Sequence, residues 1–491
     1  MSRRGSGLVA LALLAGCAAV GPDYRTPGTT TASALPLFPS AGGSGSVATV
    51  VVQEPPEQWW QLLHDAVLDA VVAQALSANY DLQAAVANVA AARAQLAQVD
   101  RRRLPSVDVA GTVRERREAG AAKRKVSPQD AEPTSALATF GLDALWEIDL
   151  FGRVRRSVEA AVADLGSVEA VRNQVLTSLL ATVASAYVDL RGAQMRLTVA
   201  ERNVSVQQQT LDLVLALNTE GAATDLDGAR ARAQLLASQA TIPVFRAAAT
   251  AAINRLTTLT AQAPGALNAQ LAAAQPLPQL PDLIAVGAPA DLLRRRADIQ
   301  AAERAIAAAS ARIGVATADL FPTVSLVATA GVSASPLSNL IAPGAPFYSF
   351  GPTLRWNIFD RAAIYARIAQ ADSAAAAAVA RYQATVTQAL EEVDTALSAL
   401  RNEQERQIQL VAAAAASRDA AQLAQLRYHE GAEDFLTVLD AERSLLLLED
   451  QVAVSTINVT QRLVDIHRAL GGGWQSAALP VDQSYTPAAS R

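Results

Sequence analysis

The residue whose type and position most clearly imply chemistry is the sole cysteine, Cys17. It follows Leu14-Ala15-Gly16, at the end of an apolar run that begins shortly after Arg3 and Arg4. Basic residues, an apolar stretch and a small-residue cleavage site are the order of a secretory signal peptide. A lone cysteine can be a buried thiol, but at this place it is typical of lipidation. We therefore expect cleavage before Cys17, with diacylglycerol in thioether linkage and an N-acyl chain such as palmitate on that residue.

The sequence contains no recognisable catalytic motif. His64, His429 and His467 are far apart and have no metal-ligand spacing, and neither a nucleotide-binding loop nor a nucleophile motif is present. The formal net charge of -5 gives no basic footprint for nucleic acid. We expect no enzymatic activity, no cofactor, no metal and no nucleic-acid partner.

Composition indicates long, closely packed helices. Of 491 residues, 51% are hydrophobic but only 4% are aromatic. Proline, the strongest helix breaker, is missing between Pro133 and Pro243 and between Pro352 and Pro480. These windows predict nearly continuous helices from Gly152 to Leu217 and from Arg361 to Tyr428. At 1.5 Å per residue, each would be on the order of 100 Å long.

Each long helix is followed by a glycine that predicts a sharp turn. Glu220-Gly221 and Glu430-Gly431 occupy matching places, and glycine suits the left-handed position after a helix end. Thr224 and Asp434 can cap the returning helices, which predicts two long helical hairpins. The return helices are expected over about 224–260 and 434–470, and shorter helices over roughly 66–103 and 291–318.

Two segments alternate polar and apolar residues and predict β-hairpins, over about 105–149 and 322–359. The apolar faces include Trp146 and Trp356. This pattern suits transmembrane strands with an aromatic girdle, but also a soluble antiparallel sheet with one buried face. The long helices and the lipidation signal favour the membrane interpretation.

Four strands cannot close a barrel, and an open edge in lipid leaves backbone groups unsatisfied. Other copies of the chain must then complete the sheet. Two copies would give about 8 strands and a filled interior, whereas three would give about 12 strands and begin to leave a lumen. The predicted fold class is therefore mainly α with a transmembrane β-barrel of 12 strands in a trimer.

The sequence repeats itself at a distance of about 210 residues, which indicates a duplicated half-protein. Phe140-Gly141 recurs as Phe350-Gly351, and Glu220-Gly221-Ala222 recurs as Glu430-Gly431-Ala432. The predicted organisation is a signal peptide (1–16), a lipidated extended linker (17–56), a first repeat (57–262, with helical hairpin about 150–262), an inter-repeat linker (263–290), a second repeat (291–473, with helical hairpin about 360–470) and a C-terminal tail (474–491).

Several motifs resemble one known family. These are Val20-Gly21-Pro22-Asp23-Tyr24 after Cys17, Leu292-Leu293-Arg294-Arg295-Arg296, Val438-Leu439-Asp440-Ala441 and Gly471-Gly472-Gly473-Trp474. The whole mature chain resembles the TolC-like outer-membrane efflux factors, in their lipoprotein branch. Ala297 departs from the pattern, because the family usually has proline there.

The resemblance implies a homotrimer in the outer membrane, anchored by Cys17, with a 12-stranded barrel continuous with a helical periplasmic tunnel. It also implies a periplasmic adaptor protein and an inner-membrane pump, of RND type, as partners. The chain would be a passive duct for small molecules such as drugs. Two alternatives remain open: the exit duct of a type I protein secretion system, and a structural periplasmic coiled-coil lipoprotein.

The same resemblance implies a periplasmic gate. Asp440 lies in the segment that forms the family's constriction, and Arg443 follows one helical turn later on the same face. Asp225 and Asp227 lie in the repeat-related return helix, where helix capping is their expected main role and charge at the aperture a secondary one. The tips Glu220, Gly221, Glu430 and Gly431 would contact the adaptor.

Overall fold

The computed structural model describes residues 19–26, 49–51, 53–117, 134–288, 292, 294–335 and 337–475. The signal segment 1–16, the lipidation site Cys17 and most of the tail after Trp474 lie outside the described residues. The chain forms two compact units, one from residues 1–27, 89–168 and 302–382, the other from residues 28–88, 169–301 and 383–491. Each unit draws on both copies of the sequence repeat.

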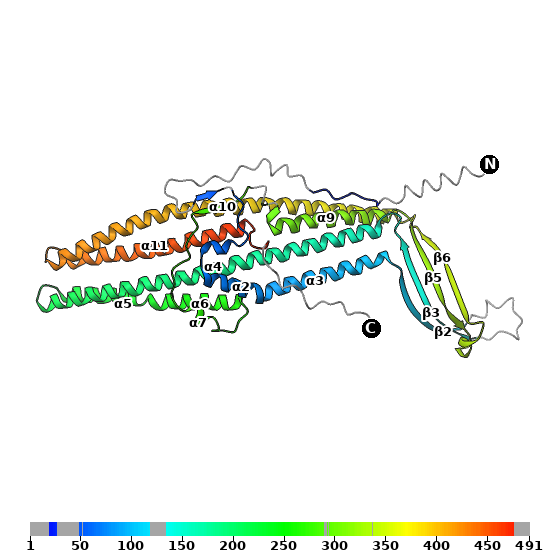
Figure 1. Cartoon of the computed structure of the whole chain (residues 1–491), viewed down its shortest axis with the longest axis horizontal. Coiled ribbons are helices and arrows are strands. Elements are labelled where there is room, and N and C mark those ends of the chain that lie inside the picture. The colour runs from blue at the N-terminus through cyan, green and yellow to red at the C-terminus, as the bar shows by residue number, and fades with distance from the viewer. Residues whose placement is uncertain are drawn as a thin grey trace. The chain divides into compact units, whose positions relative to one another are not determined.

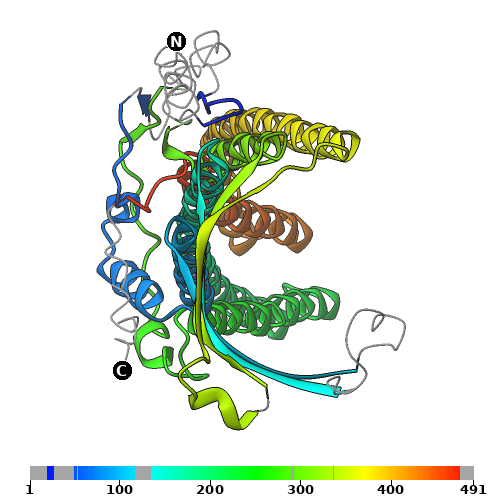
Figure 2. The same cartoon turned by 90° about the vertical axis from the view of Figure 1, so that its right-hand side faces the viewer.

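The first unit contains a four-stranded antiparallel sheet with the order β2-β3-β5-β6. Its strands are β2 (Ser106–Arg117), β3 (Thr134–Ile148), β5 (Thr323–Ala334) and β6 (Pro346–Arg355). Both predicted hairpins are present, and β3 pairs with β5 to join them into one curved sheet (Figure 2). Two short 3₁₀ turns flank the sheet, η2 (Arg101–Arg103) before β2 and η4 (Leu337–Ile341) between β5 and β6.

The two faces of this sheet differ in polarity as the alternation predicts. Residues opposite one another in the register share a face, so Val109 lies beside Leu142, whereas Asp108 lies beside Asp143. The apolar face is exposed in the single chain: Val107, Val109, Val113, Phe140, Leu142, Tyr348, Phe350 and Leu354 are all at least 50% accessible. A contiguous exposed apolar face of this kind marks a surface that meets lipid or another protein.

The two long helices have nearly the predicted ends. Helix α4 covers Arg153–Thr219 and α10 covers Arg361–His429, 67 and 69 residues respectively. Within the second unit, α4 is followed by α5 (Asp225–Gln239) and α6 (Ile242–Leu259), and α10 by α11 (Phe435–Ala469). Figure 1 shows the return helices running back beside the long ones. The helices thus form the two predicted hairpins.

Three of the predicted helices have different limits. The first shorter one is divided at Asn79 into α2 (Ala66–Ala78) and α3 (Tyr80–Asp100), because Asn79 is extended and its side chain accepts from Leu82 N and donates to Leu259 O, at 3.0 Å each. The first return helix is interrupted at Ala240–Thr241, because Pro243 has no N–H to continue the ladder. Helix α9 covers Ala297–Ala318 and so begins later than predicted.

The core of the second unit gathers residues from distant segments around α4 and α11. Trp59 and Leu63 of η1 (Trp59–Leu63) pack with Leu68 of α2, Tyr187 of α4 and Leu463 of α11. Beside it, β1 (Thr49–Val51) pairs in parallel with β4 (Leu283–Ala285), and α7 (Asn268–Leu271) is a single turn. The two segments predicted as linkers are therefore partly paired with each other. Among the described helices, none combines the length and the apolar character needed to cross a membrane.

Candidate functional site

The two hairpin tips have the same backbone geometry. Gly221 and Gly431 have φ of 79° and 71°, and space is open where a side chain would project from either. At each tip the glycine N–H donates to a carbonyl three residues back, Asn218 O or Tyr428 O, at 3.0 Å. The next residue donates to a carbonyl five residues back, which completes the Schellman closure of the helix. Glycine is needed here for its conformation and not for close packing.

The return helices begin at side-chain caps. The Thr224 hydroxyl accepts from Asp227 N at 3.3 Å while the Asp227 carboxylate accepts from Thr224 N at 3.1 Å, which is a capping box. Asp225 accepts from the Asn218 side chain at 3.3 Å, and Asp434 accepts from Thr437 N at 2.9 Å. Asp227 therefore has the capping role expected from the sequence, whereas Asp225 holds the turn.

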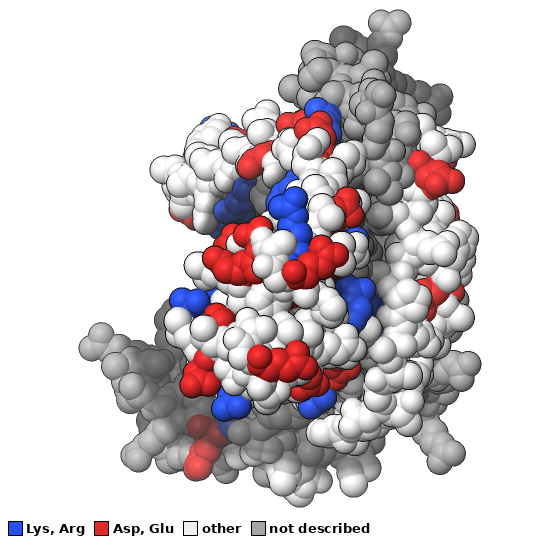
Figure 3. All heavy atoms as spheres, turned by 90° about the vertical axis from the view of Figure 1, so that its left-hand side faces the viewer, with Lys and Arg blue, Asp and Glu red and all other residues white. Residues whose placement is uncertain are grey.

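Seen from the tip end, acidic side chains form bands over the ends of the hairpins, with fewer basic ones between them (Figure 3). The acids in this region are Glu220, Asp225, Asp227, Glu430, Glu433 and Asp434. Behind the turns, apolar residues of all four helices form one small core: Leu211 and Val214 of α4, Leu235 of α5, Tyr428 of α10 and Phe435, Val438 and Leu439 of α11. The tips are thus polar surfaces on a shared apolar base.

Asp440 and Arg443 both lie on exposed positions of α11. Within the described part of the chain they form no ion pair with each other; instead, Arg443 Nε donates to Gln234 Oε1 of α5 at 2.8 Å. The structure therefore brings Arg443 into contact with the first hairpin and leaves the Asp440 carboxylate accessible. A partner for Asp440 would have to approach from outside the chain.

The sequence reasoning missed Glu442, which lies between these two residues and is buried, with 6% of its surface accessible. Its Oε1 accepts from the Thr210 hydroxyl of α4 at 2.8 Å and from the Gln425 amide of α10 at 2.7 Å. One carboxylate therefore joins α11 to both long helices. The sequence around Glu442 gives no signal of this role, because its two partners are 232 and 17 residues away.

Two further acids of α11 repeat this arrangement farther from the tip. Glu449 accepts from Arg202 of α4 at 3.1 Å and from Arg418 of α10 at 2.8 Å. Asp450 accepts both Nε and a terminal nitrogen of Arg196 of α4, at 2.9 and 3.0 Å. Paired two-point contacts of this kind fix orientation as well as distance. Helix α11 is therefore held at several levels.

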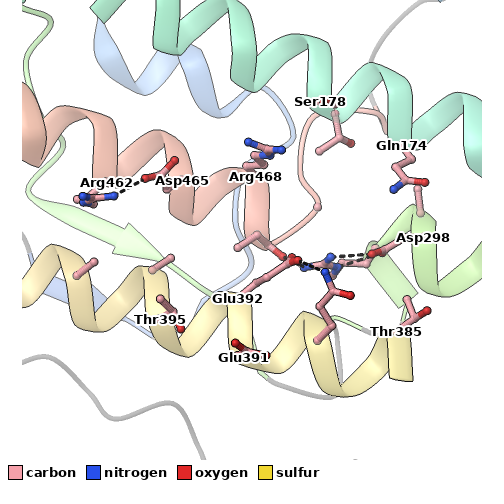
Figure 4. A pocket seen from close by; sticks show the side chains of 18 residues that line it. Gln174, Ser178, Asp298, Thr385, Glu391, Glu392, Thr395, Arg462, Asp465 and Arg468 are labelled. Carbon is pink, nitrogen blue, oxygen red and sulfur yellow. Dashed lines mark hydrogen bonds and ion pairs between the residues drawn. The ribbon is translucent and has the colours of Figure 1, made fainter. Parts of the chain in front are cut away.

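The opposite end of α11 meets the motif Leu292 to Arg296. Arg296, 8% accessible, donates to Asp298, to Glu392 at 2.7 Å and to Ala469 O at 2.9 Å. These contacts line a groove of about 700 Å³ between α4, α10 and α11, with Arg468 and Glu391 at its walls (Figure 4). A side chain at Gly471 would meet Arg296 at 2.9 Å, so the glycine motif and the arginine motif pack on each other.

His467 is the one histidine in this core. It stacks on Trp59 with ring centroids 4.9 Å apart, and burial, together with the nearby Arg295, lowers its pKa to about 3. It therefore packs as a neutral ring. Among the described residues, no group of three or more His, Cys, Asp or Glu side chains is placed to hold a metal ion.

In the first unit, the segment 19–26 is docked on the helices. Arg156, of which 4% is accessible, donates to Val20 O, Gly21 O and Asp23, at 3.1, 3.3 and 2.6 Å. A side chain on Gly21, whose φ is 90°, would lie 2.4 Å from Gly314 Cα. The Tyr24 hydroxyl donates to Glu303 at 2.9 Å, and burial followed by that contact raises the pKa of Tyr24 to about 12.

Trp146 and Trp356 lie at the same end of the sheet. Their ring nitrogens donate to Arg103 O at 2.9 Å and to Leu320 O at 3.1 Å. Each ring is partly exposed, 37% and 46%, on the apolar face. An apolar ring with its polar atom satisfied at the edge of an apolar band is the usual arrangement at a membrane–water interface.

The sequence matches the family described as Outer membrane efflux protein over residues 71–262 and 288–472. The chain belongs to that family. It is 30% identical over 466 residues to the toluene efflux pump outer membrane protein TtgC of Pseudomonas putida, covering 94% of each chain. It is 32% identical over 450 residues to the pyoverdine export outer membrane protein OpmQ of Pseudomonas putida, covering 91% of this chain and 95% of the relative.

The solved structure of the outer-membrane channel OprN has the same fold. It superposes with a TM-score of 0.84 at 39% identity, over 93% of this chain and all of that chain. Membership of this family places the protein in the outer membrane as an efflux channel component. The predicted family is confirmed, and so is the mainly helical fold with four β-strands in each chain.

Proposed function

We propose that three copies of this chain form the exit duct of a tripartite efflux system, which conducts small molecules such as drugs passively across the outer membrane. The observation that carries the proposal is the open sheet. Both β2 and β6 are edge strands, and one face of the sheet is apolar and exposed. In lipid, unpaired edges are very unfavourable, so neighbouring copies must pair with them. Three copies give a 12-stranded barrel with Trp146 and Trp356 as its aromatic girdle.

The remaining parts of the proposal follow from the family. A lipid on Cys17 would anchor each copy, and a periplasmic adaptor would meet the tips at Glu220, Gly221, Glu430 and Gly431. The pump, of RND type, would supply the energy, so this chain needs no catalytic residue. The names of two relatives mention toluene and pyoverdine, so the cargo differs within the family.

The proposed gate uses the accessible Asp440 and Arg443 of α11, with Asp225 and Asp227 as further charge at the aperture. Three Asp440 carboxylates brought together would repel one another unless cations or arginines from neighbouring copies lie between them. The contact between Arg443 and Gln234 supports this, because it ties the second hairpin to the first at that level. Opening would require that this contact is released.

Single-channel conductance in planar bilayers tests both parts of the proposal, the duct and the gate. We expect the wild-type protein to conduct weakly, and Asp440→Ala combined with Arg443→Ala to conduct more and to let antibiotics leak in. The matched control, Asp419→Ala with Arg232→Ala, removes the same two charges from exposed positions on α10 and α5. Equal conductance of the two double variants would refute the gate. A stable protein that never conducts, even with the tips altered, would refute the duct.

A further inference from the structure

A cavity of about 510 Å³ lies where the sheet meets the helices of the first unit. Its walls come from the end of α3 with η2, the start of β2, the end of β3, the start of α4 and one residue of β5. Arg101, Arg102 and Arg153 line it, and Ser106 and Ser325 belong to the polar face of the sheet. The motifs that carry the family resemblance do not include the residues that line this cavity, and neither does the proposed gate.

The positive charges of the cavity are not balanced. Arg153 is matched by Glu147, which accepts from its Nε at 2.9 Å and from a terminal nitrogen, and this contact raises the pKa of Arg153. Within the described part of the chain, the guanidinium groups of Arg101 and Arg102 have no ion pair and no hydrogen bond. Glu147 is the only carboxylate among the described lining residues. Two guanidinium groups therefore face the cavity without a partner.

The serines of the cavity differ in what they can donate. Ser106 and Ser157 already donate their single O–H groups, to Leu145 O at 3.3 Å and to Arg153 O at 2.8 Å, so they offer only acceptor oxygens. The hydroxyl of Ser325 has no partner among the described residues, so it is free to donate into the cavity. The side-chain amide of Gln98 lines the same wall. The cavity thus offers charged and neutral donors together.

We propose that this cavity is a binding site for a phosphate-type anion. Arginine forks match phosphate oxygens in pairs, and such charge-assisted bonds are stronger than neutral ones. A carboxylate would leave one of the two guanidinium groups uncompensated, whereas a phosphate monoester or a pair of phosphates brings a charge of about -2. The volume leaves room for a group attached to the phosphate.

Two sources of such a phosphate fit the position. Trp146 donates to Arg103 O, next to the cavity-lining arginines, so the cavity is at the level of the aromatic ring that would mark the lipid interface. A doubly charged phospholipid headgroup such as that of cardiolipin could therefore enter it. The alternative source is a free phosphate or pyrophosphate in the water at the polar face of the sheet.

Single substitutions test the site with a matched control in the same turn. Arg101→Gln and Arg102→Gln each remove one cavity guanidinium. Arg103→Gln removes the same charge one residue away, but Arg103 is paired with Asp100 at 3.0 Å and does not line the cavity. Calorimetry with pyrophosphate on the delipidated full-length protein measures the free anion. Native mass spectrometry after purification from cardiolipin nanodiscs measures retained lipid.

We expect one of the two probes to bind, and its affinity or retention to fall about tenfold or more in Arg101→Gln and in Arg102→Gln, with little change in Arg103→Gln. Pyrophosphate binding with this dependence identifies a soluble phosphate, and cardiolipin retention with this dependence identifies a headgroup. Binding of neither probe to the folded wild type overturns the proposal. An equal loss in Arg103→Gln also overturns it, because net charge alone would then explain the effect.

Discussion

The buried carboxylate of Glu442 allows a quantitative prediction about what holds α11 in place. In Glu442→Ala, the Thr210 hydroxyl and the Gln425 amide both lose their acceptor inside the protein. Each hydrogen bond to a charged group contributes about 1.5–3 kcal/mol, so losing both should cost about 3 kcal/mol or more. Glu442→Gln keeps an acceptor oxygen of the same size and loses only the charge, so it should cost about 1 kcal/mol.

Hydrogen exchange of peptides from α11 is the assay, because it reports local opening. About 3 kcal/mol corresponds to roughly a 100-fold faster exchange where exchange follows local opening, and about 1 kcal/mol to roughly fivefold. Asp419→Ala, on an exposed position of α10, serves as the control and should exchange like the wild type. Exchange in Glu442→Ala equal to that of the wild type would refute the idea that this residue fastens α11. Equal acceleration in the Ala and Gln variants would show that the charge, not the acceptor, is what counts.

Three other perturbations probe the tip, the docked segment and the buried histidine. Arg156→Ala should release residues 19–26, seen as rapid proteolysis there, because the three contacts of this buried guanidinium with the segment are lost. The control Val162→Ala, at an exposed position of the same helix, should stay resistant. Gly431→Ala should destabilise its tip by about 1 kcal/mol, from backbone strain alone. Amide hydrogen exchange at this turn should therefore be faster than in the wild type, and an unchanged rate would contradict the prediction. Because burial lowers the pKa of His467 from its ordinary 6.5 to about 3 in the folded protein, the unfolded chain binds the proton first on acidification. The free energy of unfolding should therefore fall between pH 6.5 and about 3. In thermal unfolding at a series of pH values, His467→Phe should lose less stability over this range than the wild type. The same pH dependence in both proteins would rule out a contribution from His467.

Local signals predict the long helices, their return helices and the four strands of the sheet, but not the short strands β1 and β4. The ends of α4 and α10 depend on Gly221 and Gly431, and the caps of the return helices on Thr224 and Asp434, all within one turn of the chain. Strand limits follow from alternation and flanking prolines. Pro243 also carries a signal, because a proline inside a predicted helix favours a break, yet the return helix predicted from the sequence runs through it.

The contacts that fasten the elements could not be predicted in the same way. Glu442 and Arg156 are charged residues in helical segments, where a solvated surface position is the usual expectation. Their burial depends on partners more than 100 residues away, such as Thr210 for Glu442 and Val20 for Arg156. Asn79 is similar, because its extended backbone is fixed by the end of α6. Periodicity identifies the buried face of a helix but not the distant residues that will contact this face.

The two copies of the repeat differ where the proposed gate lies, and their return helices differ in continuity and therefore in stiffness. In the first copy, the return segment is two helices, separated at Thr241, and its position equivalent to Asp440 is Arg230. In the second copy, α11 is continuous over 35 residues, and Glu442, Glu449 and Asp450 attach it to α4. A continuous helix transmits a displacement along its length, whereas an interrupted one can bend. Movement at the second tip would therefore strain the contacts of α11 with α4 one after another, beginning at Glu442. The first tip would follow through the Glu442–Thr210 and Arg443–Gln234 contacts and through the apolar core that both tips share.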